Sequence, residues 1–183
     1  MTQRPPLPAH MAPMADAVPR LDTERLVLRS HARDDWEAFR QIMMSDRAKY
    51  IGGKRDEVGA WSSFASDMAS WMLDGFGYWT AARRSDDKAM AFVGIIQPSH
   101  FPETEIGWLA TTEGEGQGYV SEAVEAALNW AYGSRALPTL VSYIHRDNTR
   151  SIAVAERVGA KHDPDAKPAH DDDIVYRHPR RAA

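Results

Sequence analysis

The order of apolar and polar positions divides the chain into segments with two different periods. Residues 24–30 (ERLVLRS) alternate apolar and polar side chains, and this period of two predicts a strand covered on one face. After Asp35, and again over about 57–73, apolar residues recur every three to four positions. This longer period predicts two helices, separated by Gly52 and Gly53.

The middle of the chain returns to the period of two. Residues 78–84, 90–97 and 104–112 each show strand-like alternation, and the polar stretch SDDK between the first two indicates a hairpin turn. On the third segment, the alternation places Ile106 on one face and Glu105 on the other. Three consecutive strands are therefore predicted here.

The last part of the chain alternates helices and strands. Residues 119–132 carry a regular apolar stripe that predicts a helix ending at Gly133. The short β-branched segment 139–145 predicts a buried strand, Asn148 is a suitable N-cap for the helix that follows it, and 174–178 predict a final strand. Antiparallel strands followed by this alternation are typical of a mixed α/β or α+β fold.

Length and composition predict one domain and exclude several classes of function. Residues 1–20 are rich in proline and alanine and predict a flexible leader, which leaves 21–183 as a single domain. A formal charge of −4 argues against a broad basic face for nucleic acid, and zero cysteines exclude disulfides and a cysteine nucleophile. We expect no secretory signal, because the first residues contain no continuous apolar region, and no apolar run approaches membrane-spanning length. We expect a cytoplasmic protein without nucleic-acid or membrane partners.

The histidines and aspartates between positions 162 and 173 are the side chains most suited to a metal. They interleave with prolines and match neither zinc nor calcium spacing. A solvated acidic loop explains them better, so we expect no metal site.

Residues 113–123 (EGEGQGYVSEA) place three glycines at alternate positions directly before a predicted helix. The start of a helix has unpaired N–H groups and the positive end of the helix dipole, and glycine lets an anion approach the backbone closely. The pattern indicates anion binding by the main chain, with Glu113 and Glu115 pointing outward. A turn that only caps the helix is the alternative.

Three motifs together resemble the GNAT superfamily of N-acetyltransferases, particularly its RimJ/RimL-like branch of ribosomal-protein N-terminal acetyltransferases. They are EIGW (105–108), EGQGYVSEA (115–123) and NTRSIAVAERVGA (148–160), in family order and at family spacing. The resemblance covers about residues 22–178. It implies a central, mostly antiparallel sheet flanked by helices, with a parallel strand pair that splays apart at the cofactor site.

The resemblance implies acetyl-CoA as co-substrate and no metal. N–H groups of 114–120 would hold its pyrophosphate, and the pantetheine arm would lie along 104–111, where a backbone N–H polarises the thioester carbonyl. A primary amine, either a protein N-terminus or a small molecule, would attack the acetyl carbon directly. The resemblance also allows a homodimer.

The resemblance implies specific roles for individual residues. Glu105 is the candidate general base and Ser151 the candidate proton donor to the departing thiolate. Asn148 would bind the pantetheine amide besides capping its helix, and Arg150 would meet the CoA 3′-phosphate. The expected cofactor-binding residues are Trp108, Leu109, Ala110, Gly114, Gly116, Gln117, Gly118, Tyr119, Val120, Asn148 and Arg150.

Other interpretations stay open. Glu105 and Arg150 also suit solvated surface positions, and His145 is an alternative base. Ala155 stands where many relatives carry a catalytic tyrosine, and Glu115 where many carry glutamine or arginine. These two departures favour an alternative function, a catalytically degenerate module that binds acyl-CoA. A further set, Trp61, Trp71 and Trp79, is a candidate acceptor wall, although such spacing is also typical of core residues.

Overall fold

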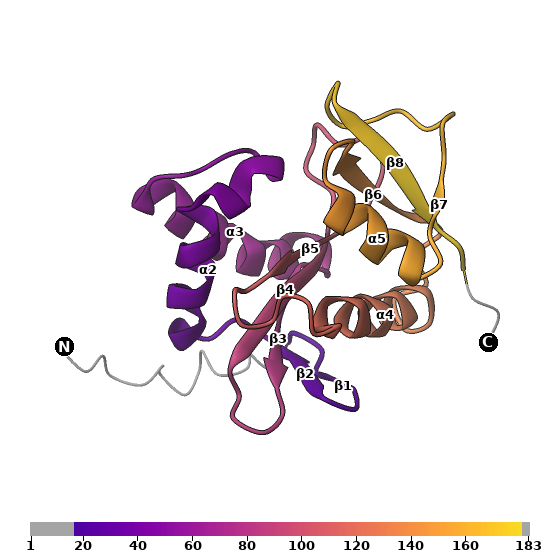
Figure 1. Ribbon diagram of the computed structural model, residues 1–183. Coiled ribbons are helices and arrows are strands. Elements are labelled where there is room, and N and C mark those ends of the chain that lie inside the picture. The colour runs from indigo at the N-terminus through magenta and orange to yellow at the C-terminus, as the bar shows by residue number, and fades with distance from the viewer. Residues whose placement is uncertain (1–16, 181–183) are drawn as a thin grey trace.

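A computed structural model describes residues 17–180, which form one eight-stranded sheet covered by helices (Figure 1). Along the sheet the strand order is β1-β2-β3-β4-β5-β6-β8-β7. The strands are β1 (Leu21–Asp22), β2 (Leu26–Arg29), β3 (Tyr78–Arg83), β4 (Ala89–Ile96), β5 (Glu105–Ala110), β6 (Leu140–His145), β7 (Lys161–His162) and β8 (Asp173–His178).

The sheet is antiparallel except where β5 meets β6, which run parallel. This mixed arrangement confirms the predicted α+β fold with one parallel pair. The short edge strands β1 and β7 were not predicted, because two residues are too few to show a period.

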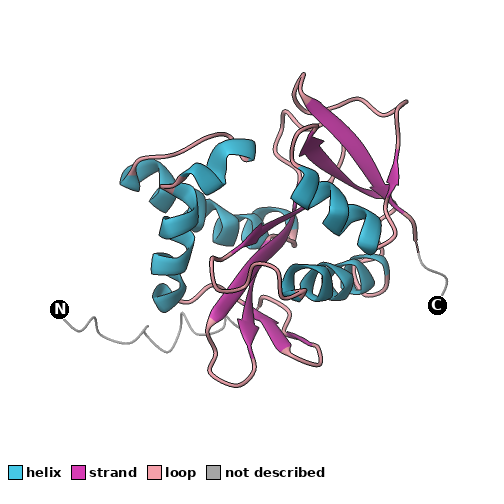
Figure 2. Ribbon diagram, viewed as in Figure 1, coloured by secondary structure: helices cyan, strands magenta, loops and turns pink. Residues whose placement is uncertain are grey.

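Helices cover both faces of the sheet (Figure 2). They are η2 (Arg33–Asp35), α2 (Trp36–Met43), η3 (Asp46–Tyr50), α3 (Glu57–Asp74), α4 (Tyr119–Tyr132) and α5 (Thr149–Arg157). In Figure 1, α2 and α3 lie on one side of the sheet and α4 and α5 on the other. Strand β4 is consequently buried on both faces: Phe92 packs with Phe39 and Phe64 of the first pair, while Val93 belongs to the core around Val124 of α4. These two apolar layers supply most of the core.

The helices on both faces of the sheet also cover both faces of β2. The alternation over residues 24–30 predicted a strand covered on one face only, but Val27 is 7% exposed, so both faces of this strand are buried. The packed chain also begins before residue 21, because Val18 lies in the core and the Trp79 indole donates to the Pro19 carbonyl at 2.8 Å. Residues 1–16 of the predicted leader lie outside the described residues.

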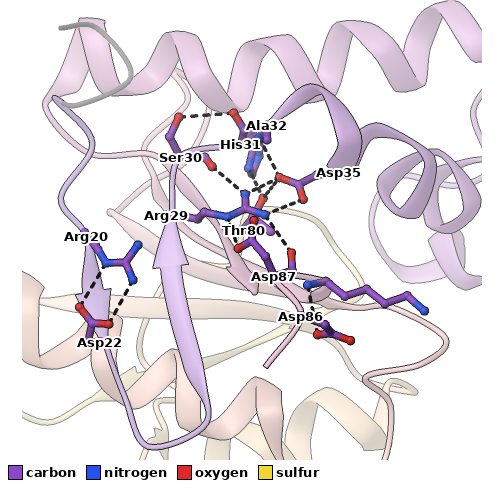
Figure 3. Close-up of polar contacts among 11 residues, drawn as sticks. Arg20, Asp22, Arg29, Ser30, His31, Ala32, Asp35, Thr80, Asp86 and Asp87 are labelled. Carbon is purple, nitrogen blue, oxygen red and sulfur yellow. Dashed lines mark hydrogen bonds and ion pairs between the residues drawn. The ribbon is translucent and has the colours of Figure 1, made fainter. Parts of the chain in front are cut away.

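A buried ion pair fixes the junction between β2 and the first helices (Figure 3). Asp35 is 4% exposed and accepts from both terminal nitrogens of Arg29, at 2.7 and 3.1 Å. The Thr80 hydroxyl and the Ala32 N–H also donate to Asp35, at 2.9 and 2.7 Å. A buried carboxylate is tolerated when donors surround it in this way, so Asp35 anchors the start of α2 against β3.

The three glycines before α4 are required for different reasons. A Cβ on Gly114 would lie 2.0 Å from the Met90 carbonyl oxygen, so only glycine allows the loop to pass this close to β4. Gly116 and Gly118 instead have positive φ angles of 76° and 79°. One glycine is thus a packing requirement and two are conformational requirements.

Gly114→Ala is expected to lower the free energy of unfolding by about 3 kcal/mol or more, because the methyl group meets immobile backbone. Gly116→Ala is the matched control: its Cβ would meet nothing within 4 Å, and only the cost of positive φ applies, roughly 1–2 kcal/mol. Urea denaturation of both variants measures the difference. Equal losses would show that the contact with Met90 is unimportant.

Candidate active site

Two cavities meet at the end of the parallel strand pair. One, of about 900 Å³, lies between η3, the glycine loop (residues 113–118) and α5, and we call it the loop cavity. The other, of about 520 Å³, lies between α3, β5 and β6, and we call it the α3 cavity. The residues that line both are Tyr50, Ile51, Trp108, Leu109, Asn148 and Ser151.

The opening between the cavities comes from the divergence of β5 and β6. Glu105 and Val141 form the one paired position between these strands, supported by a bond from the Val141 N–H to the Thr104 carbonyl at 3.1 Å. Beyond this pair the strands separate, and Figure 1 shows β6, β7 and β8 as a group set apart from β1 to β5. The predicted splay between 104–111 and 139–145 is therefore present.

Glu105 lies at the narrow end of this splay and lines the α3 cavity. Burial raises the pKa of Glu105 to about 8, repulsion by Asp173 adds to the increase, and the bond from the Tyr143 N–H at 3.3 Å opposes it. A carboxyl group with a pKa near neutral pH is suited to accept and return protons. The structure thus places this predicted base in an environment that suits the role.

Tyr78, which no pattern in the sequence singles out, lies beside Glu105. A Cβ on Gly94 or Gly107 would meet the ring or the hydroxyl of Tyr78 at 2.2 and 2.6 Å, so these two glycines make room for its phenol across β4 and β5. Burial raises the pKa of Tyr78, and the carboxylates of Glu105 and Asp67 raise it further. The raised pKa favours the protonated phenol, which can donate and accept hydrogen bonds in the α3 cavity.

Part of the glycine loop presents free main-chain donors to the loop cavity. Gly116, Gly118 and Val120 line this cavity, and within residues 17–180 their N–H groups have no acceptor. The N–H of Gly114, expected to be an anion donor, instead bonds the Thr111 hydroxyl at 3.0 Å. Fewer N–H groups of the loop are consequently available to an anion than the sequence indicated.

Gln117 and Tyr119, two of the expected cofactor-binding residues, line neither cavity. The Gln117 amide donates to the Glu113 carbonyl at 2.5 Å, and Tyr119 is 7% exposed beneath the Arg25 guanidinium, 4.5 Å from its ring. Arg25 also bonds the Gln117 carbonyl at 3.0 Å and the Glu122 carboxylate at 2.7 Å. These contacts with Arg25, which lines neither cavity, hold the loop and the start of α4 in place.

The two glutamates of the loop behave differently. Glu113 points outward to Arg83, at 2.9 Å, and to Lys88, as predicted. Glu115 lines the loop cavity between Arg47 and Arg150, at 2.6 and 2.5 Å, so the prediction that it also points away is wrong. Arg47 of η3 attracts the Glu115 carboxylate, and the sequence did not indicate this contact because Arg47 lies in a distant segment of the chain. The hydrogen bond with Arg47 lowers the pKa of Glu115.

The start of α5 contributes to both cavities. Asn148 caps the helix by accepting from the Ser151 N–H at 3.3 Å, and both side chains line the junction. Arg150 lines the loop cavity with a side chain that is 82% exposed. Ala155 is fully buried with Ile144 and lines neither cavity. Ala155, which stands where many relatives carry a tyrosine, therefore lies away from the junction of the two cavities.

Of the other predicted positions, Ala110 and His145 each line a cavity, whereas the three tryptophans do not. Ala110 lines the loop cavity with its carbonyl bonded to Arg47 at 3.0 Å, in continuation of Trp108 and Leu109. His145 lines the α3 cavity, where its Nδ1 accepts from the Asp147 N–H at 3.1 Å. The alternative acceptor wall is wrong, because Trp61, Trp71 and Trp79 line neither cavity.

Residues 17–180 contain neither a candidate metal cluster nor a candidate membrane-spanning helix. No group of three or more metal-ligating side chains is arranged there to hold an ion. None of the described helices combines the length and apolarity needed to cross a bilayer.

Comparison with solved structures identifies the fold. The acetyltransferase from Agrobacterium tumefaciens is 40% identical with a TM-score of 0.84, and the match covers 88% of this chain and 94% of that one. Mycobacterium smegmatis RimJ in complex with CoA-disulfide is 16% identical, with a TM-score of 0.67 and 87% of each chain covered. Spermidine N-acetyltransferase from Vibrio cholerae, in complex with CoA and spermine, is 12% identical with a TM-score of 0.65, covering 85% and 94%. The last two show a shared fold alone.

Sequence comparison agrees. Alpha-xylosidase A of Aspergillus niger is 30% identical over 121 residues, which are 54% of this chain but only 16% of that protein. The uncharacterized protein YkkB of Bacillus subtilis is 25% identical over 150 residues, covering 79% of this chain and 86% of YkkB. The family model of the GNAT acetyltransferase domain matches residues 25–161, from β2 to β7. With this match spanning most of the chain and the splayed strand pair in place, the chain belongs to the GNAT acetyltransferase family.

Proposed function

We propose that residues 21–183, extended at the N-terminus by Val18 and Pro19, belong to one domain that transfers an acetyl group from acetyl-CoA to a primary amine. The observation that carries this proposal is the meeting of two cavities at a splayed strand pair, next to a carboxyl group whose pKa is raised to about 8. Two substrates that react directly need such a junction, and the proton released by the amine needs an acceptor.

Acetyl-CoA binds in the loop cavity in this proposal. Its pyrophosphate accepts from the free N–H groups of Gly116, Gly118 and Val120 at the positive end of α4. The pantetheine arm continues along β5 toward the junction, where Asn148 is available for its amide groups. The thioester then lies where the two cavities meet.

The acceptor enters the α3 cavity and its neutral amine attacks the acetyl carbon. The new C–N bond forms as the C–S bond breaks, Glu105 takes the amine proton, and Ser151 supplies a proton to the departing sulfur. Ser151 lines both cavities, as this role requires. No covalent acyl-enzyme is formed, which agrees with a chain that has no cysteine.

The acceptor class is a primary amine on a protein N-terminus or a small molecule. A second candidate function is a module that binds acyl-CoA without turnover. It rests on Glu115, which departs from the residues common in the family: its carboxylate lines the loop cavity and adds a negative charge there beside Arg47 and Arg150.

Release of free thiol from acetyl-CoA tests the proposed activity. We expect thiol release with at least one member of a panel that contains simple amines, diamines and short peptides with free N-termini. Calorimetric binding of acetyl-CoA without thiol release from any acceptor would instead support the binding module. Absence of both binding and release would contradict both functions.

Glu105→Gln is expected to lower kcat by about 100-fold or more, the usual scale of general base catalysis. In the unaltered chain the rate should rise as pH increases through about 8, because only the ionised carboxyl group can accept the amine proton. Glu105→Gln should lose this rise and keep only the increase in rate that follows deprotonation of the acceptor amine, near a pH of about 10.4. A retained rise near pH 8 in the variant would exclude Glu105 as the base.

Glu115→Gln is expected to strengthen acetyl-CoA binding by roughly three- to tenfold at low ionic strength and less at high salt, because it removes a negative charge near the phosphates. Glu113→Gln is the matched control, since Glu113 pairs outside both cavities and its loss should leave Kd unchanged. Calorimetric titration of both variants measures Kd. Weaker binding by Glu115→Gln would show that this carboxylate mainly orients its arginines.

A further inference from the structure

Side chains bridge the splayed strands immediately beyond their last main-chain pair. The Ser142 hydroxyl of β6 donates to the Ile106 carbonyl of β5 at 2.6 Å. On its other side, this hydroxyl bonds Nε2 of His178 on β8 at 2.9 Å. Three strands are thereby connected through one serine, and we call this chain of hydrogen bonds the serine tie.

The protons of the serine tie can be assigned from its partners. A hydroxyl group has one proton, and a carbonyl oxygen can only accept, so the Ser142 proton points to Ile106. The serine oxygen must therefore accept from His178, which fixes the proton of the neutral imidazole on Nε2. The direction of both bonds follows without any further assumption.

The surroundings of His178 hold it in this neutral form. His178 is 2% exposed, and within residues 17–180 its Nδ1 is buried without a hydrogen-bond partner. A second proton on Nδ1 would be buried and unpaired, and burial lowers the pKa of His178 to about 4. The donor to Ser142 is therefore constant across the pH range in which Glu105 titrates.

The serine tie acts on the same residues that hold Glu105. Val141 pairs with Glu105, the next residue Ser142 bonds the carbonyl of Ile106, and the N–H of Tyr143 bonds the Glu105 carboxyl group at 3.3 Å. The bond from Ser142 to Ile106 also joins β5 and β6 just beyond their last main-chain pair, where the two strands begin to separate. The tie thus sets both the width of the opening and the position of the carboxyl group.

We propose that Ser142 and His178 are positioning residues, which hold β5 and β6 at the separation that aims Glu105 at the junction of the two cavities. Neither residue takes a proton from the acceptor. The proposal rests on the proposed function, because the role of Glu105 as base gives the tie its consequence.

Ser142→Ala is expected to lower kcat about tenfold or more, with Kd and KM for acetyl-CoA changed less than about twofold, because the loop cavity is not lined by Ser142. The pKa seen in the pH–rate profile should also rise, since the Tyr143 N–H bond that lowers the pKa of Glu105 is disturbed. Ser70→Ala is the control: the Ser70 hydroxyl bonds its own helix at 3.1 Å and lines neither cavity. Ser70→Ala should have the same kcat and the same pH–rate profile as the unaltered chain.

A pair of changes at His178 tests the tie independently if Ser142→Ala does not fold. His178→Gln keeps an N–H donor near the position of Nε2 and should retain most of kcat, whereas His178→Leu removes the donor and should lose about tenfold. Equal rates for the two variants would overturn the proposal.

The outcomes separate the tie from the proposed function. Normal kcat and an unshifted pH–rate profile in Ser142→Ala, together with a slow Glu105→Gln variant, would overturn the tie and leave the base in place. A full rate in Glu105→Gln would overturn the proposed base itself.

Discussion

The parallel contact between β5 and β6 stops after one residue pair, and the arrangement of the site depends on this early end. Strands that stayed paired would close the sheet with main-chain hydrogen bonds and leave no route between its two sides. Because they part beyond Glu105 and Val141, two cavities meet where Trp108, Asn148 and Ser151 can contribute to both. The helices on each face complete the walls, but the divergence of the strands decides where the walls can meet.

Placing Glu105 at this position opposes the stability of the fold. Its pKa is raised from 4.5 to about 8, so the folded chain keeps a proton that the unfolded chain releases above about pH 4.5. The unfolded state therefore binds fewer protons in this range, and the contribution of Glu105 to stability falls as pH increases from about 4.5 toward 8. The apolar layers around Phe92 and Val93 must offset this loss, which is the cost expected of the carboxyl group that we propose as the base.

The sequence predicted those parts of the site that depend on local order. Asn148 could be recognised as a helix cap and Glu105 as a strand residue on the face opposite Ile106, because each signal lies within a few neighbouring positions. Arg47, Tyr78 and Ser142 carried no such signal, since their roles arise from contacts with other elements that lie 16 or more positions away in the chain. Periodicity describes one element at a time, and it contains no information on which side chains meet between elements.

Glu115 shows how tertiary contacts change the meaning of a local motif. In sequence, an acid inside a glycine-rich anion loop contradicts the function of the loop. In the fold, its carboxylate lies between the guanidinium groups of Arg47 and Arg150, so this corner of the loop cavity carries two positive charges and one negative charge. The net charge still favours a phosphate, and the carboxylate keeps two like charges close together that would otherwise repel each other. An acid at this position is therefore compatible with anion binding as long as both arginines stay in place.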